Sequence, residues 1–215
     1  MLNRPDAPAQ IQGRPPRADH VLIAEMVADG ARVLDVGCGD GELLQLLEAR
    51  GHVDGRGIEI SRERVNACVA RGLSVIQGDA DSDLDDYPDK AFDYAVLSLT
   101  IQATRQPKPV LQNLLRIGRQ AIVSFPNFGH WEIRWKLLVT GRMPQTDNLP
   151  EPWYLSPDAH LCTISDFATL VDHVDADVVQ AVAFNSNGRR LPINRSIGFQ
   201  NVFGEKAVFL LQSRS

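Results

Sequence analysis

The sequence predicts an α/β fold, built on a doubly wound and mostly parallel sheet with helices on both faces. Two observations lead to this prediction. Apolar stretches of strand length alternate with segments of helical periodicity through the first half of the chain. One such stretch, Val33 to Val36, runs directly into glycines at positions 37, 39 and 41. Sheets of this class bind ligands beyond the carboxyl ends of their strands, so the glycine loop is the first candidate site.

One helix is predicted before the first strand and one after it. Asp19 can cap a helix over residues 20–29, which breaks at Gly30 before the strand begins. After the glycines, four leucines recur at helical spacing, and Gly51 ends that helix after Arg50.

The alternation continues to residue 125. The acidic stretch 80–91 is typical of an exposed loop rather than a helix. Two late strands, Val178–Phe184 and Lys206–Gln212, can pair as a C-terminal antiparallel hairpin that completes a seven-stranded sheet. Before these two strands, the other expected strands cover 55–60, 73–76, 92–99 and 119–125, and the expected helices cover 62–71 and 109–117.

Length and composition restrict the function. The chain of 215 residues suits one domain, 18–215, preceded by a proline-rich flexible arm over 1–17. The net charge is 22 − 27 = −5 without basic runs, which disfavours nucleic acid as a partner. No stretch has the pattern of a membrane span or a signal peptide, and three distant cysteines indicate neither disulfides nor a metal site. A cytoplasmic protein without a metal is therefore expected.

The glycine spacing selects among nucleotide ligands. A dinucleotide fingerprint needs glycine where this chain has Glu42, and the Gly-Lys-Ser/Thr triplet of a phosphate-binding loop is missing. Asp35, Asp40 and Glu42 make the loop acidic, which suits a ligand with ammonium and sulfonium charge. Glu59 ends the next strand twenty residues beyond Gly39, the offset at which an acid binds a ribose diol.

These residues resemble the first motif of class I S-adenosylmethionine-dependent methyltransferases, here Asp35-Val36-Gly37-Cys38-Gly39-Asp40-Gly41. The resemblance implies a Rossmann-like fold with S-adenosylmethionine or S-adenosylhomocysteine as its ligand. In similar proteins an acid at the place of Asp79 accepts a hydrogen bond from the adenine amino group. The cofactor-binding residues that the resemblance implies are Asp35, Gly37, Cys38, Gly39, Gly41, Glu59, Ile60, Asp79, Ala80 and Leu97.

Residues for chemistry or protein contacts are expected after the fourth and fifth strands. The fourth strand lacks the Asn/Asp-Pro-Pro-Tyr box with which amine methylases hold their acceptor. A second interpretation is that Trp131, Trp135 and Trp153 are core or interface anchors and that His130 packs locally. The candidates for a lid or a partner surface are His130, Trp131, Trp153, Tyr154 and His160.

Over about residues 17 to 212 the chain resembles the methionine biosynthesis protein MetW family. The resemblance rests on Phe125-Pro126-Asn127-Phe128-Gly129-His130-Trp131, Pro152-Trp153-Tyr154 and His160-Leu161-Cys162-Thr163. Leu155 and Asp158 depart from the family pattern. The resemblance implies a methyltransferase-like protein of methionine biosynthesis that acts with homoserine O-acyltransferase as its partner or activator. The alternative is an S-adenosylmethionine-dependent methyltransferase that acts on a small-molecule acceptor.

Overall fold

The computed structural model describes residues 15–146, 160–193 and 197–214. Most of the predicted arm lies outside these ranges, and so do the partner candidates Trp153 and Tyr154. The arm and the roles of those two residues stay predictions.

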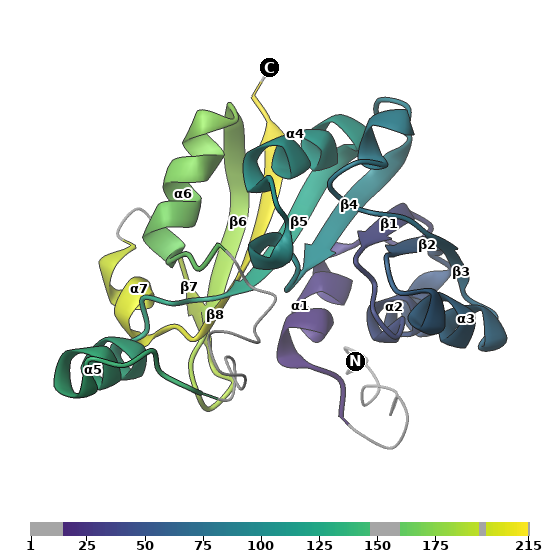
Figure 1. The fold of residues 1–215 in the computed structure, drawn as a ribbon. Helices are drawn as coiled ribbons and strands as arrows, with labels where there is room; N and C mark the ends of the chain where they lie inside the picture. The colour runs from purple at the N-terminus through teal and green to yellow at the C-terminus, as the bar shows by residue number, and fades with distance from the viewer. Residues whose placement is uncertain (1–14, 147–159, 194–196, 215) are drawn as a thin grey trace, which may run out of the picture.

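One mixed sheet of eight strands runs through the described part of the chain (Figure 1). Its order is β3-β2-β1-β4-β5-β8-β6-β7; the first five strands are parallel, and β8, β6 and β7 pair antiparallel. The predicted doubly wound α/β fold is confirmed. The strands are β1 (Arg32–Val36), β2 (Asp54–Glu59), β3 (Ser74–Gln77), β4 (Phe92–Ser98), β5 (Gly118–Pro126), β6 (Ala176–Phe184), β7 (Arg190–Pro192) and β8 (Lys206–Ser213).

The C-terminal strands confirm the predicted antiparallel pair but add one strand. β6 pairs with β8 from Ala176 opposite Ser213 to Phe184 opposite Lys206. The short strand β7, in the loop that follows β6, pairs along the outer edge of β6. The sheet therefore has eight strands rather than the predicted seven.

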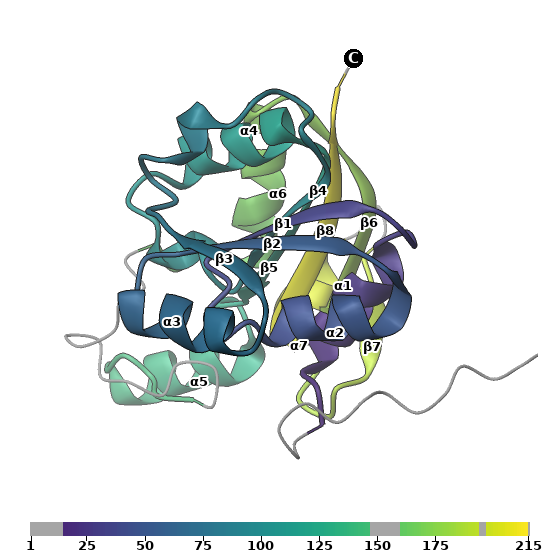
Figure 2. The ribbon, with the colours of Figure 1, turned by 90° about the vertical axis from the view of Figure 1, so that its right-hand side faces the viewer.

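Helices cover both faces of the sheet, as Figures 1 and 2 show. The helices α4 and α6 lie on one face above a core that includes Leu114, Phe125 and Phe167. The helices α1, α2 and α3 lie on the other face. The helices are α1 (Ala18–Met26), α2 (Glu42–Gly51), α3 (Arg62–Ala70), α4 (Pro107–Ile117), α5 (Trp131–Thr140), α6 (Ile164–His173) and α7 (Gly198–Phe203), with 3-10 turns η1 (Leu84–Asp86) and η2 (Ile101–Ala103).

Both predicted ends of the first helix are wrong, because α1 spans Ala18–Met26 rather than residues 20–29. Arg17, not Asp19, precedes α1, and Asp19 lies in the first turn with its carboxylate bound to the Arg17 guanidinium instead of capping the helix. The helix α2 ends at Gly51 as predicted, and His52 takes the left-handed conformation after it, with φ of 50°. The acidic stretch 80–91 contains only the turn η1, which buries Leu84, so the predicted loop is confirmed.

The sequence analysis predicts no helix at α5 or α6. The start of α6 carries a capping box, in which Thr163 and Asp166 exchange side-chain and backbone hydrogen bonds. In both views α5 lies outside the two helical layers (Figures 1 and 2). Trp131 is 49% exposed and Trp135 is 60% exposed. Of the interpretation as core or interface anchors, the core alternative is therefore wrong for these two residues, and the interface alternative stays a prediction. No helix in the described ranges is long and apolar enough to cross a membrane.

Candidate functional site

The glycine loop joins β1 to α2 with three glycines in the left-handed region. Their φ angles are +70° at Gly37, +55° at Gly39 and +75° at Gly41, where other residues are strained. A Cβ at Gly37 would lie 2.8 Å from the Thr100 side chain, and one at Gly41 would lie 2.4 Å from Leu73 Cδ1. A Cβ at Gly39 would meet no atom within 4 Å. The loop is therefore packed at its two ends and open in its middle.

The Glu59 carboxylate fastens this loop to the end of β2. Its Oε2 atom accepts a hydrogen bond of 2.9 Å from the Gly39 backbone N–H, and its Oε1 atom accepts one of 2.9 Å from Ser61 N–H. The side chain is buried, with 5% of the residue exposed. A carboxylate oxygen has two lone pairs, so each oxygen keeps acceptor capacity for a ligand hydroxyl.

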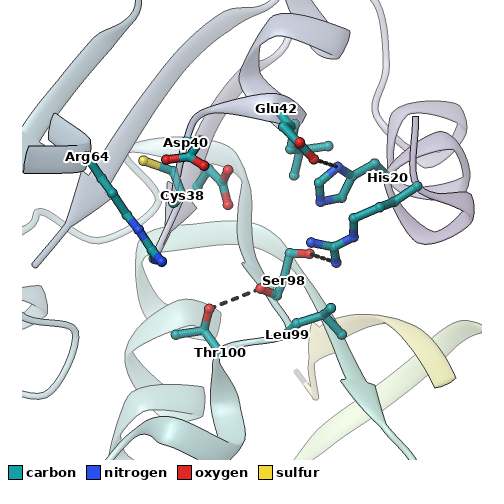
Figure 3. Close-up of a pocket in the computed structure, with 13 residues that line it drawn as sticks. His20, Cys38, Asp40, Glu42, Arg64, Ser98, Leu99 and Thr100 are labelled. Atoms are coloured by element: carbon teal, nitrogen blue, oxygen red, sulfur yellow. Dashed lines mark hydrogen bonds and ion pairs between the residues drawn. The ribbon is translucent and has the colours of Figure 1, made fainter. Parts of the chain in front are cut away.

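Two adjoining cavities lie at the carboxyl ends of β1 to β4. The first, of about 360 Å³, lies between the glycine loop, the start of α1 and the end of β4 (Figure 3). The second, of about 620 Å³, extends past the ends of β2 and β3. Gly37, Arg64, Leu99 and Thr100 line both. The two cavities therefore form one continuous site along this edge of the sheet.

Asp35 is the buried carboxyl group of the first cavity. The residue is 1% exposed, and among the described residues its Oδ1 atom has no hydrogen-bond partner. Burial raises the pKa of Asp35 to about 7, while the nearby Arg17 charge opposes the rise and Glu59 adds to it. A cationic group beside this carboxyl would favour its ionised form.

His20 forms the wall of the same cavity opposite Glu42 (Figure 3). Its Nδ1 atom lies 3.9 Å from Glu42 Oε2. Burial lowers the pKa of His20 to about 4, and the positive charge of Arg17 contributes to the shift. The imidazole is therefore neutral at neutral pH.

With this geometry described, the comparison with known proteins identifies the family. Residues 17–211 match the family of the methionine biosynthesis protein MetW. The chain belongs to the MetW family. It is 32% identical over 183 residues to the bifunctional methionine biosynthesis protein MetXA/MetW of Rhodopirellula baltica, a match that covers 80% of this chain and 29% of that protein. The chain thus spans less than a third of that relative's length.

Solved structures of low sequence identity share the fold of this MetW-family chain. One is an S-adenosylmethionine-dependent methyltransferase from Thermotoga maritima, titled a possible histamine N-methyltransferase, with a TM-score of 0.66, 15% identity and coverage of 91% of this chain and 87% of that one. Another is the 4+2 cyclase SpnF, with a TM-score of 0.64, 17% identity and coverage of 91% and 80%. At these identities the likeness establishes a methyltransferase-like fold alone.

The structure brings most of the predicted cofactor residues of this MetW-family chain to the two cavities. Asp35, Gly37, Cys38 and Gly39 line the first, and Glu59, Ile60, Asp79 and Ala80 line the second. Gly41 packs against Leu73 behind the loop and lines neither. Leu97 is fully buried in the core and also lines neither, because the end of β4 reaches the cavities only from Ser98 to Thr100.

Asp79 lies at the cavity edge but already has partners. Its Oδ2 atom accepts a hydrogen bond of 2.7 Å from Arg105 Nη2, and its Oδ1 atom accepts one of 2.9 Å from Asp81 N–H. The sequence analysis missed Arg105, and it also missed Arg17 and Arg64 in the first cavity. Isolated arginines in loops and on helix surfaces gave no spacing signal from which to find them.

Three of the partner or lid candidates are described, namely His130, Trp131 and His160, and they line neither cavity at the glycine loop. His130 is 4% exposed and precedes α5, and burial lowers its pKa while Glu205 and Glu132 oppose the shift. His160 is exposed, and its Nε2 atom lies 3.2 Å from the Arg105 carbonyl oxygen. Among the described residues, neither histidine lines the two cavities at the glycine loop.

Proposed function

We propose that this MetW-family protein binds S-adenosylmethionine or S-adenosylhomocysteine in the two cavities at the ends of β1 to β4. The observation that carries the proposal is the Asp35 carboxyl: the residue lines the first cavity, and its buried Oδ1 atom has no partner among the described residues. A buried acceptor of this kind fits a cationic ligand group, either an ammonium or a sulfonium.

The remaining cavity residues fit the other parts of such a ligand. The open space at Gly39 admits the methionine portion close to the backbone. Glu59 has acceptor capacity for the ribose hydroxyls, and Ile60, an apolar side chain that is 64% exposed, offers a face for adenine. Asp79 would bind the adenine amino group while it keeps its bond to Arg105. When bound, S-adenosylmethionine supplies a methyl group on a sulfonium.

Calorimetric titration of the full chain tests this ligand. We expect one molecule of S-adenosylmethionine or S-adenosylhomocysteine to bind per chain. Glu59→Gln should weaken binding by about 1.5–3 kcal/mol, roughly ten-fold or more, because a charge-assisted acceptor becomes neutral. The matched control is Glu63→Gln, an exposed carboxylate on α3 that lines neither cavity. Equal affinity of wild type and Glu59→Gln would remove Glu59 from the site.

We further propose that the protein acts with homoserine O-acyltransferase as a partner or activator. The support is the relative whose name joins MetXA and MetW as one bifunctional protein of methionine biosynthesis. The helix α5 supports it as well, because large apolar side chains on this helix lie exposed, as interface anchors do. S-adenosylmethionine is made from methionine, so a bound molecule would report the output of the pathway as a feedback ligand.

The alternative is a methyltransferase for a small acceptor, favoured by the open first cavity beside Ser98 and Thr100. The two functions predict different results. A methyltransferase forms S-adenosylhomocysteine from S-adenosylmethionine and an acceptor with no other protein present. A partner subunit retains the acyltransferase in a pulldown from native extract and forms no S-adenosylhomocysteine with any fraction of small molecules from that extract. Turnover without the acyltransferase would replace the partner proposal with the alternative.

A further inference from the structure

Four polar side chains converge at the carboxyl end of β5, away from the glycine loop. His130 and Glu132 lie at the start of α5, Thr146 lies in the segment after α5, and Glu205 directly precedes β8. Three of them, His130, Glu132 and Glu205, each offer one possible metal-ligand atom, and these three atoms lie within 4.8 Å of one another. All four residues line a cavity of about 10 Å³. We call these four residues the β5 cluster.

Two members of the β5 cluster present buried atoms without partners among the described residues. His130 is 96% buried, and its Nε2 atom makes no hydrogen bond. The Oγ1 atom of Thr146 is likewise buried and makes none. Since buried polar atoms in native proteins are nearly always satisfied, both atoms indicate an occupant of the cavity. The cavity has the volume of about one water-sized probe, so this occupant is a single small species.

The chemistry of the donors distinguishes a cation from a water molecule. The β5 cluster offers an imidazole nitrogen, a hydroxyl oxygen and two carboxylates, so its formal charge suits a dication. We propose that the β5 cluster binds one divalent transition-metal ion, with Zn²⁺ as its best match. Imidazole and carboxylate are the ligand types that Zn²⁺ combines in proteins, whereas Mg²⁺ and Ca²⁺ select oxygen ligands alone.

Binding requires only a local adjustment. Tetrahedral Zn²⁺ ligands lie about 3.3–3.5 Å apart, given bonds of about 2.0–2.1 Å. The three ligand atoms now lie within 4.8 Å of one another, so they would approach by at most about 1.5 Å. Glu132 now pairs with Lys136 at 2.7 Å on one face of α5, and the ion would take over that carboxylate. The ion pair of Glu132 and Lys136 is partly exposed and contributes little to stability, so it competes only weakly with metal binding.

The ion would link three segments that the sequence separates. It would join the first turn of α5 to the start of β8 and to Thr146, while α5 itself buries only Ile133. From the sequence no metal site is predicted, since the three cysteines are far apart. The ligands of the β5 cluster share no spacing motif and meet through the pairing of β5 with β8. Metal binding at the β5 cluster is independent of the ligand at the glycine loop.

The test uses the full chain without an affinity tag, freed of metal with a chelator and dialysed. Calorimetry with Zn²⁺ should show one site per chain, and Co²⁺ should give a visible absorption band of a nitrogen- and oxygen-ligated ion. His130→Gln and Glu205→Gln should each weaken Zn²⁺ binding at least ten-fold and abolish the Co²⁺ band. Because either variant could also perturb packing, Glu132→Gln, a partly exposed change on α5, should weaken binding as well.

Two matched variants serve as controls. His173→Gln removes an exposed histidine of α6, and Lys136→Met releases Glu132 from its ion pair without removing a ligand. We expect the Zn²⁺ affinity to be unchanged in the first and equal or higher in the second. Zn²⁺ should also slow hydrogen exchange of α5 amides in the wild type. No Zn²⁺ site in the wild type, or a site that all three ligand variants keep at full affinity, would overturn the proposal.

Discussion

The buried Asp35 carboxyl, at the centre of the candidate site, lowers the free energy of unfolding of the ligand-free protein as pH rises. Its pKa is about 7 in the folded protein, well above the ordinary carboxyl value of 3.8, because burial disfavours the charge. The folded state therefore holds a proton that the unfolded state has lost, and stability falls as pH rises through 7. Such a group is typical of a binding site, where a ligand compensates for the burial.

The first prediction isolates this effect between pH 6.5 and 8. The shift of His20, whose pKa falls to about 4, raises stability as pH rises from about 4 through 6.5, but this contribution is common to wild type and Asp35→Asn and cancels between them. From pH 6.5 to 8, the free energy of unfolding of ligand-free wild type should fall by about 0.8 kcal/mol more than that of Asp35→Asn. Urea unfolding at both pH values measures the difference. Parallel pH profiles of the two proteins would show that Asp35 is already ionised at pH 6.5.

The second prediction concerns the middle of the glycine loop. Gly39→Ala places a Cβ where the structure has open space, so it should cost only the left-handed strain of about 1–2 kcal/mol yet strongly weaken S-adenosylmethionine binding. Gly188→Ala is a matched control, with φ of +71°, the same open surroundings and a place in the loop between β6 and β7. Urea unfolding and calorimetry measure both. Wild-type affinity in Gly39→Ala would mean that the ligand does not approach this backbone.

At the scale of elements, α5 is the segment that the core does not explain. Its exposed side chains include Trp131, Trp135 and Leu138, and exposed apolar groups on one short helix indicate a surface for a partner. Trp135→Ala should weaken association with homoserine O-acyltransferase by about 2 kcal/mol, roughly thirty-fold, without changing S-adenosylmethionine affinity. Biolayer interferometry measures the association. Val69→Ala, an exposed apolar change on α3, should have no effect, and an equal loss in both variants would contradict a surface on α5.

The elements that the sequence predicts correctly are those with a strong local pattern. The four leucines of α2 are buried on one face, and β4 and β5 each bury a run of apolar residues, so their patterns are visible without the fold. The helix α5 has no such signal because Ile133 is its one buried residue. The start of α6 does carry a local signal, the capping box of Thr163 and Asp166, from which this helix is predictable. Arg105 reaches the site through an ion pair with Asp79, which is distant in sequence, so no local pattern records it. Arg17 pairs with its neighbour Asp19, but only the folded chain brings it next to Ser98 at the site.

At the scale of the whole molecule, the candidate sites all lie along the edge of the sheet formed by the carboxyl ends of its parallel strands. The glycine loop follows β1, Glu59 ends β2, Asp79 follows β3, and the β5 cluster lies between β5 and β8. A parallel sheet brings these chain ends together, so a ligand at β1 and a partner near α5 can share one surface. This arrangement supports a protein that binds S-adenosylmethionine at one part of the edge and a second protein at another.

The initial rate of homoserine acylation, measured with and without this chain, tests that central claim most directly. The assay uses homoserine O-acyltransferase from the same organism at a fixed concentration. The rate should rise with added wild-type chain until it saturates, and S-adenosylmethionine should shift the saturated rate. Trp135→Ala should need roughly thirty-fold more chain to reach half of the effect. A rate that is the same at every concentration of the wild-type chain, with and without S-adenosylmethionine, would contradict the account.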